Sequence, residues 1–125
     1  MKNIKVMIVD DETHIADLLS RTLKLAFKDQ IDVVISKTAE SAFRLLSTAP
    51  FDVLITDWHL PGVSGLSLIL RARKFYPQLK IVFMTASPMD EIEERVKMVA
   101  DISVMKPFKA SMLATQVQNL FQQRA

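Results

Sequence analysis

The chain has 125 residues, of which 50% are hydrophobic and 24% charged, and a formal net charge of +2. This length fits one domain with a substantial core, and the composition excludes a disordered chain. The chain lacks cysteine, which excludes disulfides and thiolate chemistry. Its lysines and arginines are scattered, and its N-terminal apolar run is too short for a signal peptide or membrane span. We therefore expect one cytoplasmic domain, residues 1–125, that contacts neither nucleic acid nor membrane directly.

Short apolar runs alternate with longer amphipathic segments in the first half of the chain. Ile4–Val9 predicts a strand, and Asp11 is placed to cap the helix that follows. Ile31–Ile35 is β-branched and predicts a second strand, after which Thr38 starts a short helix that ends by Pro50. The first helix is indicated by apolar side chains at helical spacing, namely Ile15, Leu18, Leu19, Leu23, Ala26 and Phe27.

The second half of the chain repeats this alternation. Val53–Ile55 predicts a buried strand, Ser64-Gly65 leads into a helix predicted at Leu66–Phe75, and Lys80–Thr85 predicts a fourth strand. Ser87–Asp90 is typical of a helix start, with serine at the N-cap and proline at N1, and Ile102–Met105 is a weak fifth strand. A last helix is indicated by Leu113, Val117, Leu120 and Phe121.

Five strand and helix pairs in regular alternation predict a parallel sheet with helices on both faces. Parallel strands require crossover connections, and these are right-handed. We expect an α/β, doubly wound, flavodoxin-like (βα)5 fold with strand order 2-1-3-4-5, in which ligands bind beyond the carboxyl ends of strands 1 and 3.

Polar side chains follow the apolar runs where four of the expected strands end. Asp10 and Asp11 close the first strand, Asp57 the third, Thr85 the fourth and Lys106 the fifth. Taken singly, the aspartates could be turn or helix-cap residues, Thr85 a strand-end cap and Lys106 a surface lysine. Those explanations do not predict that all five lie at carboxyl ends of strands. We therefore interpret them as one site.

The residue types indicate the chemistry of this site. Three carboxylates around one crevice repel each other and favour a cation, and a set without cysteine or paired histidines suits Mg²⁺. Lys106 adds a positive charge and Thr85 a hydroxyl, so the set suits a phosphoryl group carried on a carboxylate oxygen. Gly62 and Gly65 follow the third strand and give backbone freedom there, and the small Ala86 leaves room for a donor imidazole or a water.

The two histidines have two interpretations each. His14 could be a metal ligand and His59 a catalytic or phosphorylated histidine, but surface positions without a role are the more common case. His59 lies two residues after Asp57, close enough to influence the lifetime of a phosphoryl group there.

Several motifs together resemble the receiver domain of two-component response regulators, and in particular the chemotaxis regulators. They are Val-Asp-Asp-Glu at residues 9–12, Asp-x-x-x-x-Asp-x-x-x-Pro-Gly-x-x-Gly at residues 52–65, Thr85-Ala86, and Lys106-Pro107-Phe108. The resemblance covers the whole chain. The family is known for a cis bond before the proline of the last motif, which the sequence alone leaves open.

The resemblance implies a role for each residue of the site. Asp57 would be phosphorylated by a sensor histidine kinase, and Mg²⁺ would be bound by Asp11, Asp57 and the backbone carbonyl of His59, with Asp10 acting through water. Lys106 would contact the phosphoryl group. The remaining switch residues would be Thr85 and Ala86, with Thr85 passing the signal to the fourth helix, fifth strand and fifth helix.

The sequence also departs from the family pattern. The switch residue three positions before the lysine is usually aromatic, but here it is Ser103, and residues 100–105 contain no other aromatic. A glycine usually precedes Ala100-Asp101, where this chain has Val99, so the turn there is expected to differ. Trp58 is bulkier than the usual aliphatic residue. These changes concern the output mechanism more than the phosphorylation chemistry.

We therefore expect a phosphorylatable switch domain that turns over no metabolite and acts on a downstream protein or output domain. The sequence also leaves open that the domain forms a homodimer. The alternative is a protein-interaction module on the same fold that works without phosphorylation, which the missing aromatic residue favours slightly. A Mg²⁺-dependent phosphatase is disfavoured because the acceptor lacks an Asp-x-Asp pattern. A flavin-binding protein is disfavoured because no phosphate-binding loop follows the first strand.

Overall fold

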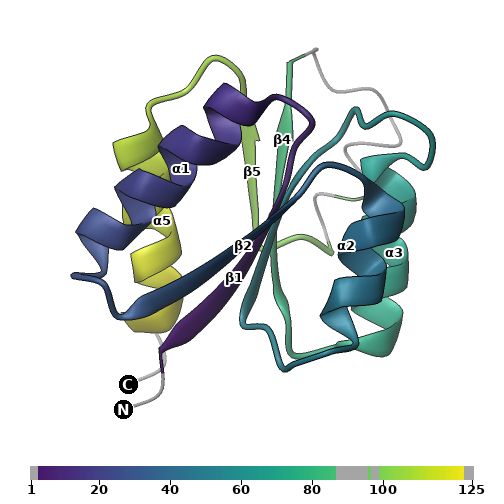
Figure 1. Cartoon of the computed structure of the whole chain (residues 1–125), viewed down its shortest axis with the longest axis horizontal. Coiled ribbons are helices and arrows are strands. Elements are labelled where there is room, and N and C mark those ends of the chain that lie inside the picture. Colours follow the sequence, from purple (N-terminus) through teal and green to yellow (C-terminus); the bar gives the residue numbers. More distant parts are fainter. Residues whose placement is uncertain (1–2, 87–95, 97–98, 123–125) are drawn as a thin grey trace.

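A computed structural model describes residues 3–86, 96 and 99–122. Strands and helices alternate along the chain, and Figure 1 shows them arranged around one central sheet. The strands are β1 (Ile4–Val9), β2 (Ile31–Ser36), β3 (Val53–Asp57), β4 (Lys80–Thr85) and β5 (Ile102–Met105). The helices in the described part of the chain are α1 (Thr13–Ala26), α2 (Ala39–Leu46), α3 (Gly65–Phe75) and α5 (Ala110–Gln122).

All strand pairs are parallel, and the strand order is β2-β1-β3-β4-β5. Helices α1 and α5 cover one face of the sheet, while α2 and α3 cover the other (Figure 1). The predicted doubly wound sheet and its order are confirmed. Within the described residues, no helix has the length and apolar character needed to cross a membrane.

Alternate residues of the central strands point to the two faces of the sheet and build two apolar clusters. In β3, Val53 and Ile55 pack toward α1 and α5, and Leu54 between them packs toward α2 and α3. All three are fully buried. A parallel strand covered by helices on both faces must be apolar on both sides, which explains the continuous hydrophobic run before Asp57.

The structure confirms two predicted helix starts and corrects a third. The Thr38 hydroxyl accepts the N–H of Ser41 at the start of α2, and the Ser64 hydroxyl accepts that of Ser67 at the start of α3. The prediction that Asp11 caps the first helix is wrong. The N-cap of α1 is Glu12, which makes no side-chain cap hydrogen bond, and its own N–H is bound by Asp10.

The expected helix that begins at Ser87–Asp90 lies outside the described residues, apart from Val96, which is helical and buried. The described residues resume at Val99, whose N–H donates to the Val96 carbonyl. Among the described residues, positive φ angles occur at Lys28, Asp29 and Gly62. The turn before β5 therefore proceeds without positive φ at Val99, as its β-branched side chain requires.

Gly65 closes the loop after β3 against the backbone that carries Asp57. Its N–H donates to the Trp58 carbonyl at 3.0 Å. A Cβ added at Gly65 would lie 2.2 Å from the Asp57 carbonyl oxygen and 2.9 Å from both Cα and O of Trp58. Any larger residue must therefore displace α3 or the end of β3.

We predict that Gly65→Ala lowers the free energy of unfolding by about 2 to 4 kcal/mol, the range of an overpacked buried position. Gly62→Ala is the matched control. Gly62 has φ +75 and open space around it, with Glu40 Oε1 3.7 Å from the added carbon, so the cost is a backbone term of about 1 kcal/mol. Urea unfolding of both variants measures the difference, and equal losses would contradict this account of Gly65.

Candidate functional site

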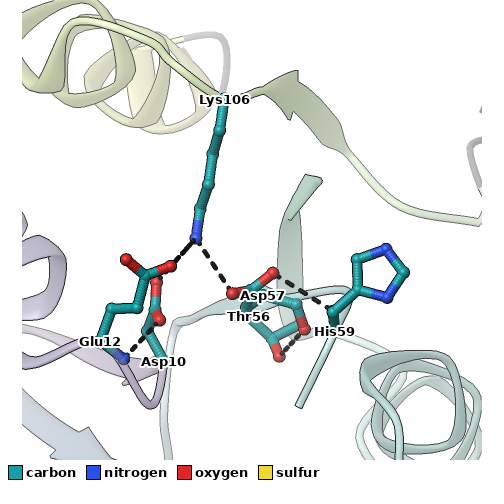
Figure 2. A network of polar contacts seen from close by, with 6 residues as sticks. All are labelled: Asp10, Glu12, Thr56, Asp57, His59 and Lys106. Atoms are coloured by element: carbon teal, nitrogen blue, oxygen red, sulfur yellow. Dashed lines mark hydrogen bonds and ion pairs between the residues drawn. The ribbon is translucent and has the colours of Figure 1, made fainter. Parts of the chain in front are cut away.

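At the carboxyl edge of the sheet, carboxylates from the ends of β1 and β3 meet the side-chain amine of Lys106, which follows β5. Asp10 follows β1, Asp57 is the last residue of β3, and Lys106 follows β5. Lys106 Nζ lies 3.0 Å from Asp57 Oδ2 and 3.2 Å from Asp10 Oδ2 (Figure 2). The backbone N–H of Lys106 donates to the Thr85 carbonyl at the end of β4. The topology therefore joins residues that are far apart in the sequence.

Asp10 is completely buried, and each of its carboxylate oxygens has a hydrogen-bond partner. Oδ1 accepts the N–H of Glu12 at 2.9 Å, and Oδ2 accepts from Lys106. Desolvation by burial nevertheless raises the pKa of Asp10 above its ordinary value of 3.8, since it outweighs the two donors, and the charge of Asp57 acts in the same direction. The ionised form of Asp10 is therefore costly in the absence of a further cation.

Asp57 is held by backbone and lysine in the same manner as Asp10. It is 5% exposed, and its Oδ1 accepts the N–H of His59 at 3.2 Å while Oδ2 faces Lys106. The pairing of β3 with β4 continues past Asp57, because the N–H of Trp58 donates to the Met84 carbonyl at 2.7 Å. The Asp57 carboxylate is thereby fixed with its oxygens toward the crevice.

Asp11 completes a cluster with the donor chemistry of a metal site. Each of Asp10, Asp11 and Asp57 offers a carboxylate oxygen, and these oxygens lie within 4.8 Å of one another. Asp11 is exposed, whereas the other two are buried. Three carboxylates against one lysine leave an excess of negative charge. A hard divalent cation such as Mg²⁺ fits this donor set.

Lys106 is 11% exposed along its side chain and is held in its charged form. Desolvation alone would lower its pKa, but the hydrogen bond to Asp57 and the charges of Asp10 and Asp57 together raise it above the ordinary 10.5. The Lys106-Pro107 peptide bond is cis. Glu12 Oε1 also lies 3.5 Å from Lys106 Nζ, a contact that sequence reasoning missed although Glu12 directly follows the two aspartates.

A cavity opens beside the lysine on the α1 side of the site. Its volume is about 470 Å³, and its walls include Glu12, Ile15, Ala86, Lys106 and Phe108. Ala86 is exposed and forms part of the cavity wall. The cavity gives an approach to the site lined mainly by apolar side chains.

Thr85 and Ser103, which occupies the usual position of the aromatic switch residue, lie on neighbouring strands. Thr85 is completely buried at the end of β4, and half-buried Ser103 pairs with Phe83 across the β4–β5 ladder. Phe83 packs on Trp58, with ring centroids 5.4 Å apart. Sequence reasoning missed this pair. The aromatic residue beside position 103 is therefore Phe83 of β4, which lies with Trp58 in the core on the α2–α3 face.

Both histidines lie at the surface. His14 is exposed on α1, and the imidazole of His59 points away from the carboxylates (Figure 2). His59 meets the site through its backbone N–H.

Two neutralising substitutions are predicted to have opposite effects on stability in Mg²⁺-free buffer. Asp10→Asn removes a desolvated charge and should raise the free energy of unfolding by about 1 kcal/mol, whereas Lys106→Gln leaves carboxylates unpaired and should lower it by about 3 kcal/mol. The pKa of Asp10 is higher in the folded protein than in the unfolded chain. The contribution of Asp10 to the free energy of unfolding of the wild type therefore falls as pH rises above 3.8. The benefit of Asp10→Asn should therefore vanish at lower pH.

Chemical unfolding across the acid range in the presence of a chelator measures both variants. Added Mg²⁺ should reduce the difference between each variant and the wild type. A destabilised Asp10→Asn at neutral pH would contradict the electrostatic account of the cluster.

Comparison with known proteins agrees with this geometry. The response regulator receiver domain family matches residues 6–118. The chemotaxis protein CheY of Pseudomonas aeruginosa is 29% identical over an alignment 127 residues long, and this alignment covers 95% of this chain and 97% of the relative. The phosphate regulon transcriptional regulatory protein PhoB of Rhizobium meliloti is 37% identical over 119 residues, which cover 91% of this chain and 50% of the relative.

Solved structures show the same fold. The CheY-like receiver domain protein of Methanospirillum hungatei JF-1 has a TM-score of 0.88 at 24% identity, over 98% of this chain and 96% of that chain. Vibrio cholerae CheY4 has a TM-score of 0.82 at 27% identity, over 94% of this chain and 98% of that one. The family match over residues 6–118 and the fold together show that the chain belongs to the response regulator receiver domain family of two-component signalling.

Proposed function

We propose that this domain is a switch that accepts a phosphoryl group on Asp57 from a sensor histidine kinase. The observation that supports this most directly is the position of the Asp57 carboxylate. It lies at the end of the central strand, 3.0 Å from Lys106 and within 4.8 Å of the Asp10 and Asp11 oxygens. Family members are regulatory domains that work with histidine kinases and downstream targets, which agrees with this role.

In the proposed reaction, a carboxylate oxygen of Asp57 attacks the phosphorus of a phosphohistidine. The new O–P bond forms as the N–P bond breaks, and the imidazole leaves with the electron pair of that bond. Lys106 is close enough to donate hydrogen bonds to a phosphoryl oxygen while the negative charge develops there. The cavity beside Ala86 and Lys106 supports the approach of the donor imidazole from the α1 side.

Asp11, Asp57 and the backbone carbonyl of His59 would hold Mg²⁺, with Asp10 acting through water. When bound, this ion would offset negative charge on the phosphoryl oxygens. The chain itself contributes the fixed carboxylates, because both Asp10 and Asp57 are anchored by backbone N–H groups. Under this proposal the domain catalyses transfer to, and hydrolysis from, its own aspartate and turns over no metabolite.

The output would run from Thr85 to the face formed by the fourth helix, β5 and α5. Thr85 adjoins the site through its carbonyl, which accepts the N–H of Lys106. A downstream protein or output domain, or a second copy of the chain, would bind this face. We place residues 1–125 in one receiver domain that acts in the cytoplasm without direct contact to nucleic acid or membrane.

One observation favours the alternative of an interaction module that works without phosphorylation. Ser103 stands at the usual aromatic switch position, and the nearby rings of Phe83 and Trp58 are packed in the core. A ring buried on both sides cannot rotate as an exposed aromatic can. If the domain does work by phosphorylation, its signal would depend on Thr85 and the adjoining loop and not on a ring in β5.

We predict that a small phosphodonor adds one phosphoryl mass to the wild-type protein when Mg²⁺ is present. Asp57→Asn should abolish the modification, and Asp11→Ala should reduce its rate by at least about tenfold, since it removes a carboxylate from the metal cluster. Intact-protein mass spectrometry measures the product. A wild-type protein that stays unmodified with Mg²⁺, while binding its partner normally, would support the interaction module.

We also predict that Thr85→Ala uncouples partner binding from phosphorylation while Asp57 still accepts the group. Ser103→Ala should change partner binding little, because a serine side chain has too little volume to fill and vacate a switch pocket. The coupling should be about 1 to 3 kcal/mol. Partner affinity measured with and without a phosphoryl mimic distinguishes the two variants. Uncoupling in Ser103→Ala and no effect in Thr85→Ala would contradict this account of the switch.

A further inference from the structure

A second surface feature lies at the opposite end of the sheet from the carboxylates. Helices α2 and α3 lie side by side (Figure 1), and both end near the start of β3 and β4. Between these ends is a groove with a volume of about 650 Å³. One wall carries Leu46, Pro50 and Phe51, and the other Phe75, Tyr76 and Leu79. We refer to it as the α2–α3 groove.

An aromatic cluster stands at the rim of the α2–α3 groove. The ring of Phe43 lies 5.9 Å from that of Phe75 and 6.4 Å from that of Tyr76, measured between centroids. Phe75 remains 58% exposed, and Leu70 on the same helix is 50% exposed. Exposed apolar side chains next to a hollow are typical of a binding surface.

Two cations are ordered on these rings. Arg71 Cζ lies 4.1 Å from the centroid of Phe43, and Lys74 Nζ lies 5.5 Å from that of Phe75. Cation–π contacts of this kind hold the charges beside the groove while leaving their N–H donors available. Both side chains belong to exposed residues.

The wall formed by the α3–β4 turn is rigid, because Arg73 fixes its backbone. Arg73 Nη1 donates to the carbonyls of Pro77 and Leu79 at 3.0 and 2.8 Å. Its Nε and Nη2 donate to the Val99 carbonyl, and Nη2 also pairs with Asp101. The N–H of Leu79 donates to the Tyr76 carbonyl. A groove with a fixed wall loses little conformational entropy when it binds a ligand.

Positive charge dominates around the groove. The segments 39–52 and 65–80 contain Arg44, Arg71, Arg73, Lys74 and Lys80 against two acids, Glu40 and Asp52, and the Asp52 carboxylate accepts the N–H of Lys5. Arg73 is neutralised by Asp101, but Arg44 and Lys74 are exposed in the last turns of α2 and α3. These full charges outweigh the partial negative charge, about half a unit per helix, at the two C-termini. The surface is complementary to an anionic ligand.

We propose that the α2–α3 groove binds an acidic peptide segment of a partner protein. An aromatic or aliphatic side chain of the peptide would enter the groove between Phe51 and Phe75, and its acids would pair with Arg71 and Lys74. A nucleic acid fits less well, because cations already cover faces of the Phe43 and Phe75 rings that bases would stack on. An anionic membrane fits less well because the lining of the groove comes from helix ends and turns, and a membrane-bound surface usually presents one long amphipathic helix.

The groove lies at the amino ends of the strands, whereas Asp57 lies at a carboxyl end. Binding there is therefore independent of the proposed phosphorylation and would tether the domain to a partner in either state of the switch.

The experiment uses the full chain and a displayed library of short random peptides as the probe. Selection is on the wild type, with counter-selection on the double variant Phe75→Ser/Lys74→Glu. We expect enrichment of peptides that combine several Asp or Glu residues with an aromatic or aliphatic residue. Selected peptides, made synthetically, should lose at least about tenfold in affinity for the double variant and should bind more weakly at high salt. Binding to Asp57→Asn should be unchanged.

Leu25→Ser/Lys24→Glu is the matched control, because it removes an 82% exposed leucine and a neighbouring exposed cation from the last turn of α1. It should bind the selected peptides like the wild type. Circular dichroism checks that each variant is folded. The proposal is overturned if no peptides are enriched, if basic peptides are enriched, or if the control loses as much affinity. It is also overturned if single-stranded RNA or anionic phosphatidylserine vesicles bind the wild type in a Phe75-dependent way and the peptides do not.

Discussion

The contact of Lys106 with two buried carboxylates is the interaction on which the rest of the site depends. Asp10 and Asp57 come from adjacent strands and would repel each other across the crevice, and each is largely removed from water. One amine at 3.0 to 3.2 Å from both offsets that repulsion. The compensation is incomplete, because the pKa of Asp10 is still raised by its burial. An arrangement with an uncompensated charge of this kind favours binding of another cation.

Two features place Asp57 within this electrostatic arrangement. The apolar β3 strand carries Asp57 to the edge of the sheet, and Gly65 allows α3 to begin against the backbone of the same residue. The backbone N–H of His59 then binds one carboxylate oxygen, so the other faces Lys106. On the α2–α3 face of the sheet, the packing of Trp58 on Phe83 anchors the chain directly after Asp57. Asp57 is thus held by rigid elements on both sides, as chemistry that needs a fixed orientation of the reacting groups requires.

The switch and the α2–α3 groove divide the surface between two proposed roles. The carboxyl edge carries Asp57 and an apolar cavity beside Ala86, while the amino edge carries exposed aromatic rings and ordered cations. Arg73 belongs to the amino edge, where it ties the end of α3 to the residues that lead into β5. A domain with a phosphorylation-dependent face and a constant docking surface could keep one partner bound while it changes another contact.

The sequence by itself determined the sheet, its order and the residues that meet at its edge. A parallel α/β sheet has few allowed connections, so the alternation of strands and helices was enough to predict that Asp10, Asp57 and Lys106 converge. The helix starts at Thr38 and Ser64 were predicted correctly, but the cap at Asp11 was not, because Asp10 binds the N–H of Glu12 and Glu12 is the N-cap. Only the tertiary structure showed that Glu12 reaches Lys106, that Phe83 lies beside Ser103, and that Phe43, Phe75 and Tyr76 form one cluster. Such contacts depend on register and on side-chain direction between elements distant in the chain, which the pattern of a single segment does not encode.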